Sequence, residues 1–172
     1  ALVSLREKLA RLDARPDEKS PQLKFVTILF TDIVGSTQIS QGLDAEDTLA
    51  VMDEALQRFG AVVERHGGRV LRYQGDGLMA IFGAPLAREG DAERAVHAGL
   101  SLLDEASRYA VTVQERWGLA DFKIRVGLNT GQAVVGAGVE AENTVMGMAI
   151  NLAARMESSA PPGCLLISHD TY

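Results

Sequence analysis

The chain has 172 residues, 47 % of them hydrophobic, which favours a globular domain over a disordered chain. Its net charge of −6 argues against a nucleic-acid partner. Its single cysteine cannot form an internal disulfide, so we expect a cytoplasmic protein. No apolar run approaches the roughly 20 residues of a transmembrane helix, and no signal peptide opens the chain.

The first 22 residues are predicted to form a helix and a linker. Four leucines recur at helical spacing with charged residues between them, and two prolines flank a polar stretch typical of a linker. These are Leu2, Leu5, Leu9, Leu12, Pro16 and Pro21. The helix either extends from an upstream partner region or packs against its own domain. We expect one domain over 23–172, and, because the chain lacks an initiator Met, a fragment of a longer protein.

The remaining segments alternate between β-rich runs and amphipathic helices, separated by Gly and Pro signals. In chain order we predict a buried strand at 25–30, a helix after 35–37, a helix from about 44 to 66, a hairpin of 69–73 and 78–82, a helix at about 91–117, strands at 122–128 and 132–136, a helix at about 148–158 and a strand at 165–167. This order predicts an α+β sandwich, ferredoxin-like at its centre, with a mostly antiparallel sheet and helices packed on it.

Two aspartates occur at predicted strand ends. Asp32 follows the buried strand, and Asp76 lies at the tip of the hairpin. Either alone is more often a helix cap or a turn residue. Together, at adjacent strand ends, they could hold two Mg²⁺ ions about 3.5–4 Å apart, an arrangement used for phosphoryl displacement. The backbone N–H groups of Gly35, Ser36 and Thr37 open a helix and could face a triphosphate.

Four segments carry a more specific signal than either aspartate. They are FTDIVGST at 30–37, QGDGLMAIFG at 74–83, RVGLNTG at 125–131 and NLAARM at 151–156. In this order they resemble the catalytic domain of the class III adenylyl/guanylyl cyclases, from about Phe25 to the C-terminus. The resemblance implies that the ribose 3′-hydroxyl of ATP attacks the α-phosphorus, giving 3′,5′-cyclic AMP and pyrophosphate.

The resemblance also implies which residues act. Asp32, Asp76 and the carbonyl of Ile33 match the ligands of two Mg²⁺ (or Mn²⁺) ions. Asn151 and Arg155 match the pair that orients the ribose and stabilises phosphoryl charge; their i, i+4 spacing places them on one helix face. In the family each site is shared by two protomers, so we expect a homodimer, with a heterodimer as the alternative.

The residues expected to select the base depart from the family pattern. Adenylyl members usually have a lysine four residues before the second aspartate, where this chain has Arg72; the other position is Thr144. The Thr144 hydroxyl can accept from the 6-amino group of adenine. Arg72 could also donate to guanine O6, so ATP is expected and GTP stays open. Arg125 matches a residue near the triphosphate, although an exposed strand arginine is an alternative.

Three other functions compete with the cyclase reaction. The first is a degenerate cyclase domain that only binds nucleotide or dimerises. It is favoured by Arg72, which departs from the family pattern, and by the missing C-terminal strands, which in the family carry a lysine that binds the triphosphate. A diguanylate cyclase is excluded because the hairpin at 74–77 lacks a second acid. A kinase or phosphatase is disfavoured by the absence of a phosphate-binding loop, and His66, His97 and His169 are expected to be caps or surface residues.

Overall fold

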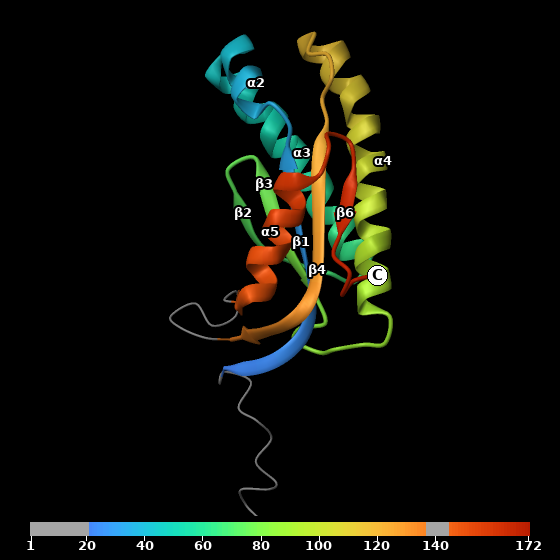
Figure 1. Ribbon diagram of the computed structural model, residues 1–172. Helices are drawn as coiled ribbons and strands as arrows, with labels where there is room; N and C mark the ends of the chain where they lie inside the picture. The colour runs from blue at the N-terminus through green and yellow to red at the C-terminus, as the bar shows by residue number, and fades with distance from the viewer. Residues whose placement is uncertain (1–20, 137–144) are drawn as a thin grey trace, which may run out of the picture.

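The protein is described by a computed structural model over residues 21–136 and 145–172. The predicted N-terminal helix and Thr144 lie outside these residues. The elements are β1 (Gln22–Ile33), α2 (Ser36–Gly42), α3 (Ala45–Arg65), β2 (Arg69–Gln74), β3 (Gly77–Phe82), α4 (Asp91–Trp117), β4 (Ile124–Val135), β5 (Val145–Met146), α5 (Met148–Ser159) and β6 (Leu165–Ile167). Figure 1 shows their arrangement.

The strands form a six-stranded sheet in the order β2-β3-β1-β4-β5, with β6 beside β4. Among the described strands only β6 and β4 pair in parallel; the other pairings are antiparallel. Strand β1 lies between β3 and β4, as its continuous apolar run predicted. The predicted α+β sandwich with a mostly antiparallel sheet is therefore confirmed.

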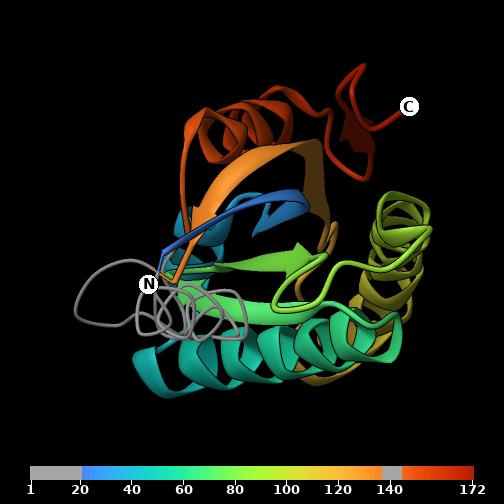
Figure 2. The same ribbon diagram turned by 90° about the horizontal axis from the view of Figure 1, so that it is seen from below.

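Helices cover both faces of the sheet. Figure 2 shows the sheet between α3 on one side and α5 on the other. Alternate residues of β1 contribute to two separate cores: Leu29 and Ile33 pack with α3 and α4, and Val26 and Ile28 pack with α5. By the same alternation, Asp32 lies on the face that carries α5.

The two long helices begin and end where the sequence predicted. Asp44 caps α3, and its side chain accepts a hydrogen bond of 2.8 Å from the N–H of Asp47. His66 is the C-cap residue of α3. The buried Tyr109 of α4 donates its hydroxyl to the carbonyl of Val51 in α3 at 3.0 Å, which ties the helices together. Within the described segments no helix is long and apolar enough to cross a membrane.

Three strands differ from the prediction: β1 is longer than the predicted 25–30, β5 was not predicted, and β4 is continuous. Strands were expected at 122–128 and 132–136, with Asn129, Thr130 and Gly131 between them, but β4 runs without a break from Ile124 to Val135. These three residues pair with β1, and the Thr130 hydroxyl bonds to that of Thr27 at 2.9 Å. Glycine fits within this central strand because α5 packs closely over it, where a Cβ atom at Gly131 would lie 3.2 Å from the Cβ of Ala149.

Candidate active site

The hairpin between β2 and β3 brings Asp76 to Asp32. The backbone N–H of Ile33 donates to the carbonyl of Asp76 at 3.2 Å, and Gly77 lies directly opposite Asp32 in the sheet. A Cβ atom at Gly77 would lie 2.3 Å from the carbonyl oxygen of Thr31, so only glycine permits this approach. The structure thus brings the two predicted aspartates together, with Ile33 at the end of β1 beside them.

Asp32 has an unusual charge state. Its pKa is raised from 3.8 to about 7, firstly by burial, then by the negative charge of Asp76 and a hydrogen bond with that carboxyl group. Two carboxyl groups this close cannot both ionise at low cost, so the pair retains a proton near neutral pH. A cation bound between them would replace that proton and remove the repulsion.

The donor set fits a divalent hard cation. The paired carboxylates are the oxygen ligands that Mg²⁺ prefers, and Mg²⁺ commonly takes its other ligands from water and phosphate. Across residues 21–136 and 145–172, no group of three His, Cys, Asp or Glu side chains is arranged to hold a metal ion. Asp32 and Asp76 would therefore bind a cation jointly with other oxygens, such as the Ile33 carbonyl and the phosphates of a substrate.

Arg125 and Glu157 complete the charged cluster around the pair. Arg125 lies opposite Asp32 in β4, and its positive charge opposes the rise in the Asp32 pKa. Glu157 of α5 has a raised pKa, firstly because of burial; Arg125 opposes this rise and Asp76 adds to it. The Nε atom of Arg125 is buried and has no hydrogen-bond partner in the described part of the chain, so this guanidinium retains a donor.

Helix α5 packs closely on β4 at two glycines of the strand. A Cβ atom at Gly127 would lie 2.0 Å from the backbone nitrogen of Glu157, and one at Gly131 would lie 3.2 Å from the Cβ of Ala149. Between these glycines, the buried Asn129 donates its amide to the carbonyl of Ala149 at 3.0 Å. Packing and hydrogen bonding together fix the distance and rotation of α5 relative to the sheet.

That rotation exposes both predicted α5 residues on one side. Asn151 and Arg155 are exposed and line the same hollow, of about 530 Å³, with residues 129–132 of β4 and Asp170. Neither Asp32 nor Asp76 lines this hollow. Within one chain, therefore, the structure groups the predicted residues into two sets, the aspartate pair and the Asn151–Arg155 pair.

The loop after β1 matches its predicted position at the start of a helix. Gly35 is the N-cap residue of α2 with a φ of 72°, a conformation that favours glycine. No side chain caps this helix, and its first turn, which includes Ser36 and Thr37, contains no acidic residue. The first N–H groups of α2 are therefore not satisfied by a capping side chain.

The base-selecting residues are only partly placed. Arg72 is exposed on β2 and lies opposite Met79, beyond an irregularity in the β2–β3 register. Met79 pairs with Phe30, two residues before Asp32, so Arg72 lies on the same face of the sheet as Asp32. Thr144 lies outside the described residues, and its role stays a prediction.

Sequence reasoning missed several residues. Glu157 was not named, because the matching segment at 151–156 stops one residue before it. Asp170 was not named because it follows the last predicted strand. His66 and His97, expected as separate caps or surface residues, line one pocket in the structure; nothing in their spacing indicated this, because they lie on different helices.

Comparisons with known proteins agree with this architecture. Residues 18–172 match the family model described as the adenylate and guanylate cyclase catalytic domain. Adenylate cyclase 1 of Rhizobium meliloti is 36 % identical over 135 residues, which are 77 % of this chain and 20 % of that protein. The chain thus spans about a fifth of that relative's length.

Solved structures show the same similarity. The adenylyl cyclase CyaB from P. aeruginosa is 32 % identical with a TM-score of 0.84, covering 89 % of this chain and 81 % of that one. A guanylyl cyclase crystal structure is 33 % identical with a TM-score of 0.82, covering 88 % and 78 %. Both nucleotide specificities thus occur among similar structures.

Proposed function

Because this chain belongs to the adenylate and guanylate cyclase catalytic domain family, and is a class III nucleotidyl cyclase domain, we propose that it converts ATP to 3′,5′-cyclic AMP and pyrophosphate. The observation that carries this proposal is the pairing of Asp32 with Asp76. Burial and the neighbouring Asp76 raise the pKa of Asp32 to about 7, and the pair is built from the oxygen ligands that hard divalent cations prefer.

Each proposed role follows from a residue's position. Asp32 and Asp76, with the Ile33 carbonyl, would hold two Mg²⁺ (or Mn²⁺) ions, which when bound lower the pKa of a coordinated hydroxyl and neutralise phosphate charge. Arg125 lies opposite Asp32 and would contact the triphosphate, as would the N–H groups of residues 35–37.

Asn151 and Arg155 would act on the nucleotide from the other protomer. Asn151 orients the ribose, and Arg155 stabilises the negative charge that develops on the phosphoryl oxygens. The separation of these two residues from the aspartates within one chain supports a site that is shared between two copies. Each homodimer then has two equivalent sites related by its two-fold axis.

ATP is the proposed substrate, and GTP is the second candidate. Thr144 can accept a hydrogen bond from the 6-amino group of adenine, and two of the similar proteins are named adenylate or adenylyl cyclases. Arg72, however, can donate two parallel hydrogen bonds, a geometry that suits the O6 and N7 acceptors of guanine. This exposed arginine is the specific observation that favours GTP.

A product assay tests the reaction and the substrate together. ATP and GTP are offered at equal concentration with Mn²⁺, and the cyclic nucleotides are separated by chromatography. We expect cyclic AMP to predominate, and Asp76→Ala to lower its formation by about 100-fold or more. Asp53→Ala removes an exposed carboxylate of α3 and should leave the rate unchanged. Predominance of cyclic GMP would contradict ATP as the substrate, and absence of any cyclic product would contradict the proposed reaction.

A further inference from the structure

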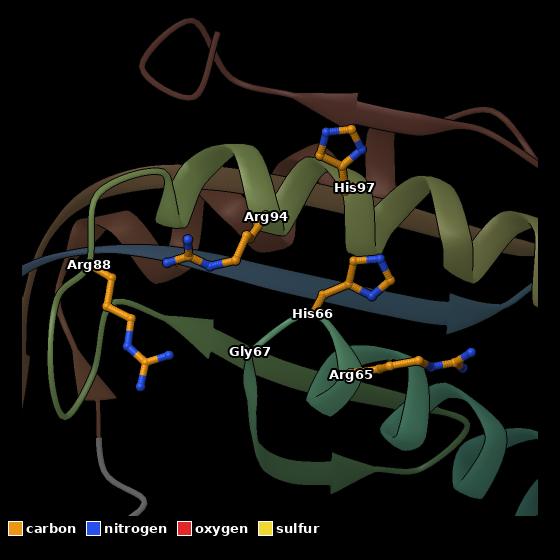
Figure 3. A pocket seen from close by; sticks show the side chains of 6 residues that line it. All are labelled: Arg65, His66, Gly67, Arg88, Arg94 and His97. Carbon is orange, nitrogen blue, oxygen red and sulfur yellow. The ribbon is translucent and has the colours of Figure 1, made fainter.

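A second pocket, of about 490 Å³, lies far from the two aspartates along the sheet. Strand β3 leads from Asp76 at one end of the sheet to the loop before α4 at the other end. The lining residues come from the end of α3, this loop and the first turns of α4, as Figure 3 shows: Arg65, His66, Gly67, Arg88, Arg94 and His97. We call this the arginine pocket.

The lining of the arginine pocket is cationic, although the chain is acidic overall. Three arginines and two histidines line it without any Asp or Glu, whereas the whole chain has a net charge of −6. Arg65 and Arg88 form no ion pair with any other described side chain. Asp91 lies beside this lining, since it pairs with Arg94 and accepts from the backbone N–H of Arg88 at 2.6 Å. The side chains of Arg65 and Arg88 therefore supply the positive charge that no described ion pair offsets, and this charge favours binding of an anion.

Two other lining side chains contact acidic neighbours. Arg94 pairs with Asp91 at 2.5 Å and donates to the carbonyl of Glu89 at 3.0 Å. His97 lies 3.8 Å from a carboxylate oxygen of Glu93, with both side chains largely exposed. These contacts fix the orientation of Arg94, and none of them involves the side chain of Arg65 or Arg88.

Hydrogen bonds of His66 link the end of α3 to α4 at the wall of this pocket. His66 donates from Nδ1 to the carbonyl of Val62 at 2.9 Å, since a carbonyl can only accept. Its other ring nitrogen, Nε2, bonds to the hydroxyl of Ser101 on α4 at 3.2 Å. Gly67 has a φ of 80°, and a Cβ atom there would lie 3.7 Å from Nε of Arg94. A larger residue at Gly67 would therefore extend toward the Arg94 guanidinium.

We propose that the arginine pocket binds a small oligophosphate, a ligand with two or more linked phosphoryl groups. Guanidinium groups match phosphate oxygens in a bidentate geometry, and the volume is in the usual range for small-molecule sites. Figure 3 shows Arg94 extending toward the loop that carries Arg88, whereas the Arg65 side chain extends in the opposite direction, away from both. A ligand that contacts Arg65 as well as Arg88 and Arg94 must be longer than a single phosphate. The inference does not depend on the reaction proposed above.

The test is a titration followed by ¹⁵N NMR, with EDTA present so that no cation offsets the negative charge of Asp32 and Asp76. The probes are inorganic phosphate, pyrophosphate and ATP. We expect saturable shifts of the Gly67 and Gly90 amide signals, with tighter binding of pyrophosphate than of phosphate. Similar affinity for pyrophosphate and ATP would identify the phosphate chain as the recognised group, and tighter ATP binding would add a nucleoside contact at the same pocket.

Matched variants separate specific binding from a general charge effect. Arg65→Gln combined with Arg88→Gln removes two exposed cations and should raise the Kd for pyrophosphate by about tenfold or more. Arg108→Gln with Arg116→Gln removes the same charge farther along α4 and should change the Kd by less than about twofold. Arg88→Lys, which keeps the charge and loses the planar donor pair, should give an intermediate Kd.

Three results would overturn the proposal: no saturable shift with pyrophosphate, equal weakening by both double variants, or phosphate binding as tightly as pyrophosphate. Asp76→Ala should leave the shifts at Gly67 and Gly90 unchanged. If that variant abolishes them, the shifts depend on the aspartate end of the sheet and do not report binding in the arginine pocket, which overturns the proposal.

Discussion

Asp32 combines a raised pKa with a position at the end of a central strand. Its neighbours on three sides are Asp76 in the hairpin turn, Arg125 across the sheet and Glu157 on α5, and all three influence its charge. The two acids and burial favour the protonated form, whereas Arg125 favours the ionised form. This residue therefore couples the stability of the domain to pH and to any cation that the aspartates bind.

The first prediction concerns this coupling. Because the folded state raises the pKa of Asp32 from 3.8 to about 7, the folded protein binds the proton more tightly than the unfolded chain does. Without divalent cations, the free energy of unfolding should then fall as pH rises from about 4 to about 7. Asp32→Asn should flatten this slope, as measured by urea unfolding across that range in EDTA.

The matched control is Asp53→Asn, which alters an exposed carboxylate of α3 and should retain the wild-type slope. Addition of Mn²⁺ should stabilise the wild type most at the upper end of the range, where the carboxylates are free to bind it. An identical slope in wild type and Asp32→Asn would contradict the assignment of the proton to this pair.

Arg72 gives a second prediction at the scale of the residue. Its planar guanidinium can bond simultaneously to two acceptors, which guanine offers at O6 and N7 and adenine does not. Arg72→Lys retains the charge and removes this bidentate option. The ratio of cyclic AMP to cyclic GMP should rise by about three- to tenfold in the competition assay. Arg108→Lys on α4 serves as the control, and an unchanged ratio in Arg72→Lys would exclude Arg72 from base selection.

Helix α5 depends on two glycines of another element for its position. It carries Asn151, Arg155 and Glu157, and it approaches β4 at Gly127 and Gly131. The asparagine between those glycines holds the first turn of α5 through its bond to Ala149. Residues of β4 thus decide where the side chains of α5 lie.

The third prediction is that Gly127→Ala displaces α5. The added Cβ atom would lie 2.0 Å from the nitrogen of Glu157, so helix and strand must separate. We expect a loss of about 1–3 kcal/mol in the free energy of unfolding, together with a lower cyclase rate at saturating ATP. Gly42→Ala is the matched control, because its nearest neighbour is a side-chain atom at 3.9 Å. Equal stability of both variants would show that α5 does not need the close contact.

The whole molecule presents its predicted site residues in two groups. The aspartate pair lies where β1 meets the β2–β3 turn, and Asn151 and Arg155 line a hollow beside β4 that excludes both aspartates. We proposed that a second copy of the chain brings the two groups together. On this proposal a monomer is inactive. Two chains that each lack a residue of a different group can form a dimer with one intact site.

Mixing experiments test that arrangement and give the fourth prediction. Asp76→Ala and Arg155→Ala chains should each be inactive alone. After equal mixing and re-equilibration, about half of the dimers contain both variants, and one of their two sites has every residue intact. The mixture should therefore recover about a quarter of the wild-type rate. No recovery, in a mixture shown to form mixed dimers, would place both groups of residues in one chain's own site.

Much of the fold followed from local patterns. The caps of α3, the bounds of α4 and the hairpin around Asp76 depend on residues close in sequence, whose hydrogen-bonding and turn preferences act locally. The break predicted at Asn129, Thr130 and Gly131 was wrong for a non-local reason. Those residues favour turns in isolation, but β1 pairs with them. The close packing of α5 also needs a position without a side chain at Gly131.

The sequence by itself determined the family resemblance, most of the elements in their order and the choice of the two aspartates as candidate ligands, because these depend on residue types at short spacings. Tertiary structure alone decided that Glu157 joins Arg125 and the aspartates, and that Arg65, Arg88 and Arg94 surround one pocket. Burial and the approach of distant charges set a pKa and create a binding surface, and both depend on contacts between elements that are separated along the chain. For that reason the charge state of Asp32 and the arginine pocket were visible only in the folded molecule.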